Sequence, residues 1–273
     1  TRQGHAGTEG GHMHLREELR PIVAIVQARM SSTRLPGKVM KGIAGRPMLW
    51  HVVNRLKASR LIDEIVVATT TGCEDDIIEE WCSLNGTPVS RGSLDDVLDR
   101  YYQAALSFGA KTIVRITSDC PLIEPALVDR AIQRFNQGGF SHVSVDSSYP
   151  DGLDAEVFSF EALEKAHKEA ALASEREHVT PYIWKNPHLF SLGKIKSDVD
   201  LSAMRWTVDD KLDLKFVTEI YEGIGAGERV FRMEEVLRFL RGRPELLKIN
   251  SATARNEGYA KSLRQDRVVK KAG

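Results

Sequence analysis

Short apolar runs alternate with longer amphipathic stretches from residue 22 onward. The run 22–26 is apolar throughout, which is typical of a strand buried on both faces of a sheet. Apolar residues recur at helical spacing over 48–56, and a second strand-like run follows at 64–69. A strand, a helix and a second strand in this order predict parallel strands joined by a crossover helix.

The alternation continues to about residue 135. Further predicted elements are helices over 75–84, 93–108 and 125–135 and strands at 88–89 and 112–116. Ser93 is the predicted N-cap of the helix at 93–108, with Asp96 completing a capping-box-like arrangement. We therefore expect a Rossmann-like α/β fold of three layers, with a mixed, mostly parallel sheet between two layers of helices.

Beyond residue 140 the pattern becomes less regular. The predicted elements there are strands at 142–145 and 154–158, helices at 161–171 and 175–184, a strand at 205–208 that returns to the sheet and a helix at 212–221. We expect residues 1–20 to be a disordered tail or tag and 21–250 to form a single domain. Residues 251–273 are expected to be a C-terminal tail, either a surface helix or disordered.

The charge balance and the cysteines limit the classes of partner. The 273 residues include 38 Lys and Arg and 38 Asp and Glu, so no overall field attracts nucleic acid or acidic membranes. Three cysteines without a C-x-x-C pair favour a reducing compartment, and no apolar run approaches the ~20 residues of a membrane span. We expect a cytoplasmic protein without nucleic-acid or membrane partners.

Positive charge is concentrated in the loop after the first predicted strand. Residues 27–38 include Arg29, Arg34 and Lys38 beside small residues and a Pro-Gly pair. Ligands of open α/β sheets bind beyond the carboxyl ends of the strands, where this loop lies. Two guanidinium groups and one ammonium suit a triphosphate, and Gly37 lets the backbone approach it. The loop is not a Walker P-loop, and the alternative reading is a solvated basic turn.

Two aspartates follow predicted strands in the same way. Asp119 comes three residues after the strand at 112–116, and Asp209 comes directly after the strand at 205–208. Mg²⁺ prefers few carboxylates together with phosphate oxygens, so the pair is a candidate metal site. Alternatively, Asp119 only closes a turn and Asp209 only caps the next helix.

The spacing A-R-x-x-S-x-R-L-P-G-K over residues 28–38 resembles the signature loop of the cytidylyltransferases that make CMP-activated acidic sugars, the CMP-acylneuraminate and CMP-3-deoxy-manno-octulosonate synthetases. Over residues 21–224 the chain most resembles their spore-coat polysaccharide biosynthesis branch. The motifs of that branch occur here in the same order, at 90–93, 115–122, 149–157, 176–182 and 205–209. The resemblance implies a sheet of the nucleotide-sugar transferase type, with a small protruding element near 140–200 that makes a homodimer.

The resemblance also implies roles for individual residues. Asp119 and Asp209 would bind Mg²⁺ and act in catalysis with Arg29, Arg34 and Lys38. CTP would be held by Ala28, Arg29, Ser31, Arg34, Lys38, Arg91, Gly92, Ser93, Arg100 and Ser118. Thr70, which follows a predicted strand, is a further candidate for the ribose or base, with a polar turn as the alternative. The alternative for the segment 90–93 is an ordinary capped helix with a solvated Arg91.

Candidates for the acceptor pocket lie in the second half of the chain. They are Asp154, Glu156, Arg176 and His178, whose acidic and basic groups suit a hydroxylated, polar acceptor. Glu156 lies within a strand pattern, where a carboxylate needs a polar partner, and we expect Arg176 or His178 to be that partner. His178 is more typical of a structural hydrogen-bonding residue than of a catalytic base.

Together these features predict transfer of CMP from CTP to an acidic sugar or sugar-like acceptor with release of pyrophosphate, in surface polysaccharide or glycoconjugate biosynthesis. A glycosyltransferase that uses a sugar nucleotide is the alternative on the same layout, but its usual D-x-D motif is missing near Asp119. A nucleotide-binding protein without catalysis would not need both candidate metal carboxylates. The segment 118–121 departs from the Gln-Gly-Asp pattern of the octulosonate enzymes, which argues against that acceptor.

Overall fold

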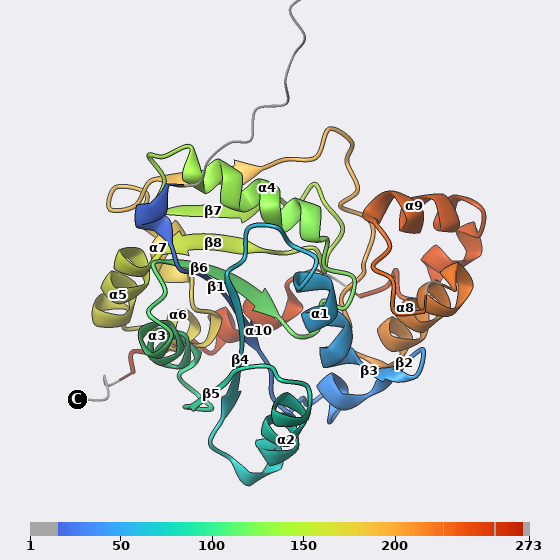
Figure 1. Cartoon of the computed structure of the whole chain (residues 1–273), viewed down its shortest axis with the longest axis horizontal. Helices are drawn as coiled ribbons and strands as arrows, with labels where there is room; N and C mark the ends of the chain where they lie inside the picture. The colour runs from blue at the N-terminus through green and yellow to red at the C-terminus, as the bar shows by residue number, and fades with distance from the viewer. Residues whose placement is uncertain (1–15, 226, 254, 270–273) are drawn as a thin grey trace, which may run out of the picture.

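A mixed sheet forms the centre of the computed structural model, which describes residues 16–225, 227–253 and 255–269 (Figure 1). Within these ranges the sheet has seven strands, in the spatial order β5 (Val89–Gly92), β4 (Glu64–Thr70), β1 (Ile22–Gln27), β6 (Thr112–Thr117), β8 (Glu156–Ser159), β7 (His142–Val145) and β9 (Leu192–Ile195). β8 runs antiparallel to β6 and β7, and the other neighbouring strands are parallel. This confirms the predicted Rossmann-like, mostly parallel sheet.

The central strand β1 is buried on both faces. Ile22, Ala24 and Val26 point into one apolar core, and Val23 and Ile25 point into the other. Each of these side chains is at most 1% exposed. A continuous apolar run is therefore required here, because side chains of a strand alternate between its two faces.

Helices cover both faces of the sheet. The core that contains Ile22 is completed by α1 (Met48–Leu56), α2 (Asp76–Leu84), α4 (Pro125–Asn136), α8 (Lys211–Ile224) and α9 (Met233–Arg241). The opposite core is completed by α3 (Val97–Ser107), α5 (Phe160–Glu169) and α7 (Pro181–Lys185). Smaller elements are the hairpin of β2 (Gly42–Ile43) and β3 (Arg46–Pro47) and 3₁₀ turns at Glu17–Leu19, Lys38–Met40, Cys73–Asp75 and Pro244–Lys248.

The strand order determines where a ligand can enter. β1 pairs with β4 on one side and with β6 on the other. The order in which successive strands are added to the sheet therefore reverses at β1. The loops beyond the carboxyl ends of β1 and β6 leave a crevice at such a switch point. The basic loop at 27–38 and the loop that carries Asp119 are these two loops.

The region after residue 190 differs from the prediction. β9 was not predicted, because Leu-Gly-Lys-Ile is a short edge strand without an apolar run. The predicted strand at 205–208 is wrong. Trp206 and Val208 are fully buried, but their N–H groups bond to the carbonyl oxygens of Asp151 and Asp119 in neighbouring loops rather than to a strand.

Two predicted helices are also corrected. The helix at 175–184 is interrupted between α6 (Ala173–His178) and α7, because Val179 adopts a φ of +73° and Pro181 begins the second helix. The helix predicted from Ser93 begins at Val97. Its N-cap is Asp96, whose carboxylate accepts the N–H of Asp99, while the Ser93 hydroxyl accepts the N–H of Asp96.

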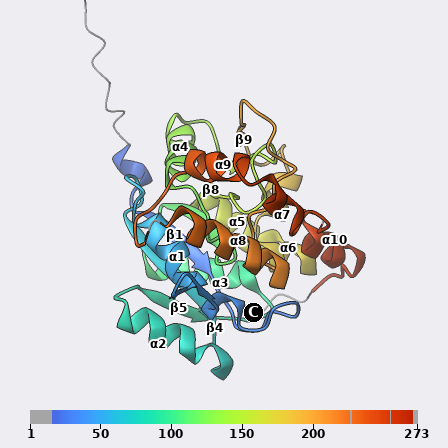
Figure 2. The same cartoon turned by 90° about the vertical axis from the view of Figure 1, so that its right-hand side faces the viewer.

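The C-terminal segment forms a surface helix, α10 (Glu257–Arg264), which packs against α6 (Figure 2). The segment continues antiparallel to residues 172–174, where Ala173 donates to the carbonyl of Arg267 at 2.8 Å and Ser174 Oγ donates to Asp266 at 2.7 Å. Most of the tail predicted at 1–20 lies outside the described residues. No helix in the described part of the chain combines the length and apolar character that membrane crossing requires.

Candidate active site

A cavity of about 1040 Å³ lies beyond the carboxyl ends of β1 and β6. Its wall is built by the basic loop after β1, the Asp119 loop after β6, the segment 205–209, α6 and α10. The cavity therefore occupies the switch point of the sheet, where the sequence predicted a ligand.

Lys38 lies between the two candidate metal aspartates. Its Nζ donates to Asp119 Oδ2 at 2.8 Å, to Asp209 Oδ1 at 2.9 Å and to the carbonyl oxygen of Val208 at 3.0 Å. Gly37, with a φ of +67°, makes the turn that places Lys38 at the start of a 3₁₀ turn. The Val208 N–H in turn bonds to the Asp119 carbonyl at 2.8 Å, which joins the two loops that carry the aspartates.

The electrostatics of this group favour its charged forms. Burial alone would lower the pKa of Lys38, but the negative charges of Asp119 and Asp209 raise it above its usual value. Burial would raise the pKa of Asp119, but the Lys38 charge and hydrogen bond and a hydrogen bond from Thr117 lower it to about 2. Three oxygen atoms thus surround one cation.

This donor set fits Mg²⁺, which takes oxygen ligands from one or two carboxylates and completes its shell with phosphate and water oxygens. Asp119 and Asp209 supply the carboxylates, and the Val208 carbonyl is a third oxygen beside them. Among the described residues, no group of three or more His, Cys, Asp and Glu side chains is arranged to hold a metal ion.

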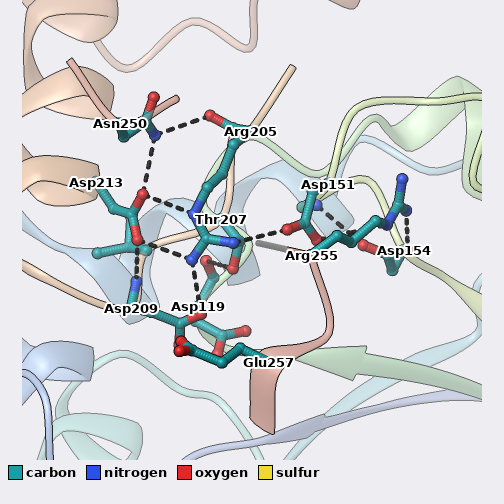
Figure 3. A network of polar contacts seen from close by, with 12 residues as sticks. Asp119, Asp151, Asp154, Arg205, Thr207, Asp209, Asp213, Asn250, Arg255 and Glu257 are labelled. Carbon is teal, nitrogen blue, oxygen red and sulfur yellow. Dashed lines mark hydrogen bonds and ion pairs between the residues drawn. The ribbon is translucent and has the colours of Figure 1, made fainter. Parts of the chain in front are cut away.

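Arg205 organises the carboxylate side of the cavity (Figure 3). Its guanidinium forms a fork on the fully buried Asp213 with two contacts of 2.9 Å, and also donates to Asp151 at 2.8 Å and to Asp209 at 2.9 Å. Asn250 donates to Asp213 at 2.9 Å from the other side. The position of Asp209 is thereby fixed from α8 as well as from the basic loop.

Two further cations of the cavity, which we call its cation side, have no carboxylate partner among the described residues. Arg29 is exposed to the cavity. Arg100 is only 2% exposed; its Nη1 donates to the Ser93 carbonyl at 3.0 Å, while its buried Nε has no partner. Burial lowers the pKa of Arg100, and the charge of Arg29 lowers it further. A buried cation with unused donors is costly unless an anion binds there.

Ten of the candidates from the sequence line the cavity. They are Ala28, Arg29, Arg34, Lys38, Arg100, Ser118, Asp119, Asp154, His178 and Asp209. The other candidates lie behind or beside its wall. They are Ser31, Thr70, Arg91, Gly92, Ser93, Glu156 and Arg176.

Arg91 and Thr70 hold a turn together. The Arg91 guanidinium donates to the carbonyls of Thr70 and Gly72 at 2.7 and 2.8 Å and pairs with Asp76 and Glu79. The Thr70 hydroxyl donates to the buried Asp75. The idea of a solvated Arg91 is therefore wrong, and these groups are already used within the protein.

The expected partner of Glu156 was wrong. Glu156 contacts neither Arg176 nor His178, and its carboxylate instead accepts from Arg115 Nη1 at 2.7 Å and from the Thr180 hydroxyl at 2.8 Å, with His142 Nε2 at 3.0 Å. Register explains this choice, because Arg115 is the direct neighbour of Glu156 across β6 and β8.

Arg176 and His178 have separate surroundings although they lie on one helix. Arg176 makes a fork on the N-cap carboxylate of Asp96, with contacts from 2.5 to 3.0 Å, and so ties α6 to α3. His178 faces the cavity, and its Nε2 lies 2.9 Å from Ser262 Oγ on α10.

The sequence interpretation did not assign two arginines or the helix α10 to the site. Arg205 and Arg115 are both present in the quoted motifs, but Asp151 and Glu156, which pair with them, lie 54 and 41 residues away in the sequence. Glu257 at the start of α10 pairs with Arg34 at 2.9 Å, and Arg255 pairs with Asp154 at 2.7 Å. A cationic segment at 255–267 was the available signal for α10, and the chain fold was needed to place it.

The chain resembles proteins of known family along most of its length. The cytidylyltransferase family model matches residues 23–241. The chain is 39% identical over 240 residues to an uncharacterized protein of Methanocaldococcus jannaschii, covering 87% of this chain and 97% of the relative. It is 35% identical over 216 residues to the spore coat polysaccharide biosynthesis protein SpsF of Bacillus subtilis, covering 76% of this chain and 88% of the relative.

A solved structure agrees with these relationships. A cytidylyltransferase from Leptospira borgpetersenii superposes with a TM-score of 0.78 at 32% sequence identity, covering 83% of this chain and 96% of that one. The match to the family model includes both aspartates and the whole basic loop. The chain belongs to the cytidylyltransferase family and is a CTP-dependent nucleotidyltransferase.

Proposed function

We propose that this enzyme transfers CMP from CTP to an acidic sugar or a sugar-like acid and releases pyrophosphate, with Mg²⁺ as its cofactor. The observation that carries the proposal is the convergence of Asp119 and Asp209 on the ammonium of Lys38, beside unpaired cations in one cavity. Such a site can hold a metal ion and a polyphosphate next to each other.

The phosphates of CTP bind in this proposal at the basic loop. Arg29 and Arg34 donate to phosphate oxygens, and the Lys38 ammonium moves from its carboxylate partners onto the leaving pyrophosphate. Arg100, buried beneath the same cavity, supplies a donor to the nucleotide, as does the backbone near Ser118. Gly92 and Ser93 support Arg100 from behind, since a Cβ at Gly92 would lie 3.2 Å from Arg100 Cγ and the Ser93 carbonyl accepts from Arg100 Nη1 at 3.0 Å.

Mg²⁺ held by Asp119 and Asp209 would supply positive charge that neutralises the phosphate oxygens. The two carboxylates are prepared for this because Asp119 is ionised, with a pKa of about 2, and Arg205 fixes Asp209. A preorganised site of this kind lowers the barrier without reorganising during the reaction.

The chemical step is an in-line displacement at the α-phosphorus. An acceptor hydroxyl oxygen forms the new P–O bond, the bond to the bridging oxygen breaks, and pyrophosphate leaves with that electron pair while the hydroxyl proton is lost to water. In this proposal the acceptor binds near Asp154 and His178, which line the same cavity as the basic loop. Residues of the chain orient the two substrates and neutralise the phosphate charge, and no covalent enzyme intermediate is required.

The likeness to a spore coat polysaccharide protein supports a role in making a surface polysaccharide or glycoconjugate. We also propose a homodimer in the cytoplasm. The neutral net charge and the three cysteines without a close pair support that compartment.

A pyrophosphate-release screen tests the reaction. The enzyme is incubated with Mg²⁺, each of the four nucleoside triphosphates and a panel of acidic sugars that includes N-acetylneuraminate and 3-deoxy-manno-octulosonate. We expect pyrophosphate and a CMP conjugate from CTP, identified by mass spectrometry. Consumption of a preformed sugar nucleotide instead, with release of a nucleoside phosphate, would identify a glycosyltransferase and contradict the proposal.

A further inference from the structure

Arg115 is a charged residue in the middle of a buried strand. It lies in β6 between Ile25 of β1 and Glu156 of β8. Its side chain is 16% exposed and lines the cavity. Among the described residues, Nη1 has Glu156 as its partner at 2.7 Å, and neither Nη2 nor the buried Nε has one. The Nη2 donors therefore remain free for a ligand in the cavity.

Glu156 is committed to holding Arg115. One of its oxygens accepts from Arg115, and the other is shared by Thr180 and His142. Burial would raise the pKa of Glu156, but the Arg115 charge and the hydrogen bond of His142 lower it to about 2. The carboxylate is ionised and surrounded by donors of the protein, so it orients Arg115 rather than binding substrate.

α10 brings further positive charge to the same corner. Lys261 and Arg264 line the cavity, and within the described ranges neither side chain has a carboxylate partner. They lie outside the residues 23–241 that the family model matches. His178 connects the two groups, because it contacts Ser262 of α10 at 2.9 Å and its pKa is lowered by burial and by the charge of Arg115.

We propose that Arg115, at the cavity floor, and Lys261 and Arg264, on α10, bind the carboxylate of the acceptor. This inference rests on the proposed function and names how the acid is recognised. A planar guanidinium with free donors suits a carboxylate, and the two helix cations add charge at the entrance. The phosphates of the proposed function are bound by Arg29 and Arg34, so the two anionic groups would use different cations of one cavity.

Steady-state kinetics of Arg115 variants tests the inference, with N-acetylneuraminate and 3-deoxy-manno-octulosonate as acceptor probes. Arg115→Gln with Glu156→Gln replaces the ion pair by two amides and leaves no buried unpaired charge. We expect the KM of the acceptor to rise at least tenfold while the KM of CTP changes less than twofold. Arg115→Lys should recover part of the loss, and Glu156→Gln alone should raise the acceptor KM with an unchanged CTP KM.

Lys261→Gln with Arg264→Gln keeps the inference testable if the strand variants do not fold, because both side chains are on the surface. We expect the acceptor KM to rise about three- to tenfold, and Lys215→Gln on the exposed face of α8 is the matched control. Melting temperatures are measured for every variant.

Two results would overturn the inference. The first is an acceptor KM within twofold of wild type in both the strand and the helix variants. The second is an equal rise in the CTP KM, which would assign these cations to the triphosphate. Failure of the proposed function would be seen separately, because the wild-type enzyme would then release no pyrophosphate from CTP with any of the acids. That result would also overturn the inference.

Discussion

The two sides of the cavity treat charge in opposite ways. On the carboxylate side, Lys38 and Arg205 each bridge several acids, and Asp213 is completely buried within this group. On the cation side, Arg29 has no carboxylate partner within the part of the chain that the structure describes, and Arg100 is buried with an Nε that has no hydrogen-bond partner there. Both sides contribute residues to one cavity, so they differ in the partners of their charged groups.

This difference indicates what each side is prepared to bind. Burial alone would raise the pKa of Asp119, but the Lys38 charge lowers it, and Lys38 and Arg205 hold Asp209 in place. In the proposed function a metal ion and phosphates then replace these partners. An unpaired buried cation costs stability, which an anionic ligand can recover as binding free energy. The charged groups on the carboxylate side are thus paired without a ligand, whereas the cations on the other side gain a charged partner only when an anion binds.

The largest effect should come from breaking the carboxylate side. We expect Asp119→Asn and Asp209→Asn each to lower kcat by about 10²–10³-fold, because the amide keeps the volume but removes the anionic oxygen that Mg²⁺ needs. Removal of divalent cations with a chelator should abolish wild-type activity, and added Mg²⁺ should restore it.

The control for these variants is Asp95→Asn, an exposed aspartate that does not line the cavity. It should have wild-type kcat. Full activity of the wild-type enzyme in chelator would contradict the assignment of Asp119 and Asp209 as metal ligands, whatever the variants do.

A substitution on the cation side should have a smaller effect, in which stability rises and CTP affinity falls. Arg100→Met removes a buried unpaired charge, so we expect the melting temperature to rise by about 2–4 °C, as for a gain of ~1 kcal/mol. The affinity for CTP should fall about 10- to 100-fold, because a charge-assisted donor to the nucleotide is lost. Differential scanning fluorimetry and titration calorimetry measure the two quantities.

Arg55 provides the matched comparison, since it is equally buried but paired. Its guanidinium donates to the carbonyls of Ile123 and Phe231 at 2.6 and 2.8 Å and lies 3.8 Å from Glu124. Arg55→Met should therefore destabilise the protein by about 3–5 kcal/mol and leave CTP affinity unchanged if it folds. Equal losses of stability in both variants would show that Arg100 is structural.

The contrast between the two sides was only partly readable from the sequence. The apolar run at 22–26 and the loop behind it define β1 and the basic loop locally, and Asp119 follows a strand of the same kind. Their common location follows from parallel topology alone. For this reason the basic loop and Asp119 could be assigned to one crevice in advance, whereas Asp209 was placed there by a predicted strand at 205–208 that does not form.

The partners of charged residues could not be predicted in the same way. Arg91, Arg176 and Glu156 were expected to face substrate, yet each forms contacts inside the protein. The pairing of Glu156 with Arg115 depends on the antiparallel register of β8, and β8 follows an irregular stretch of sequence. The fold determines which oppositely charged group lies within about 3 Å of a carboxylate or guanidinium, and the local sequence pattern does not predict that partner.

The position of the C-terminal helix could likewise not be predicted from the sequence. The tail after residue 254 is charged and, taken as a whole, only weakly periodic, which left a surface helix or disorder as alternatives. The helix is held by contacts that are distant in sequence, such as Ser174 with Asp266. Only the assembled fold places its charges in the cavity wall.

The smallest effect should come from the contact that links α10 to the basic loop. Arg34 pairs with Glu257 at 2.9 Å and with Asp209 at 3.0 Å, so removal of the Glu257 charge leaves Arg34 with one of these two acidic partners and favours its transfer to a phosphate. Both side chains are partly exposed, so the pair is worth about 0.2–1 kcal/mol, and Glu257→Gln should tighten CTP binding by at most about fivefold. The gain should shrink at high ionic strength, because salt already screens this pair.

Glu228→Gln, which removes an exposed partner of Arg46 outside the cavity, should leave CTP affinity unchanged. Calorimetric titration at two salt concentrations measures both variants. Weaker CTP binding by Glu257→Gln would mean that this carboxylate belongs with Asp119 and Asp209 on the carboxylate side, and the division between the two sides would have to be redrawn to include α10.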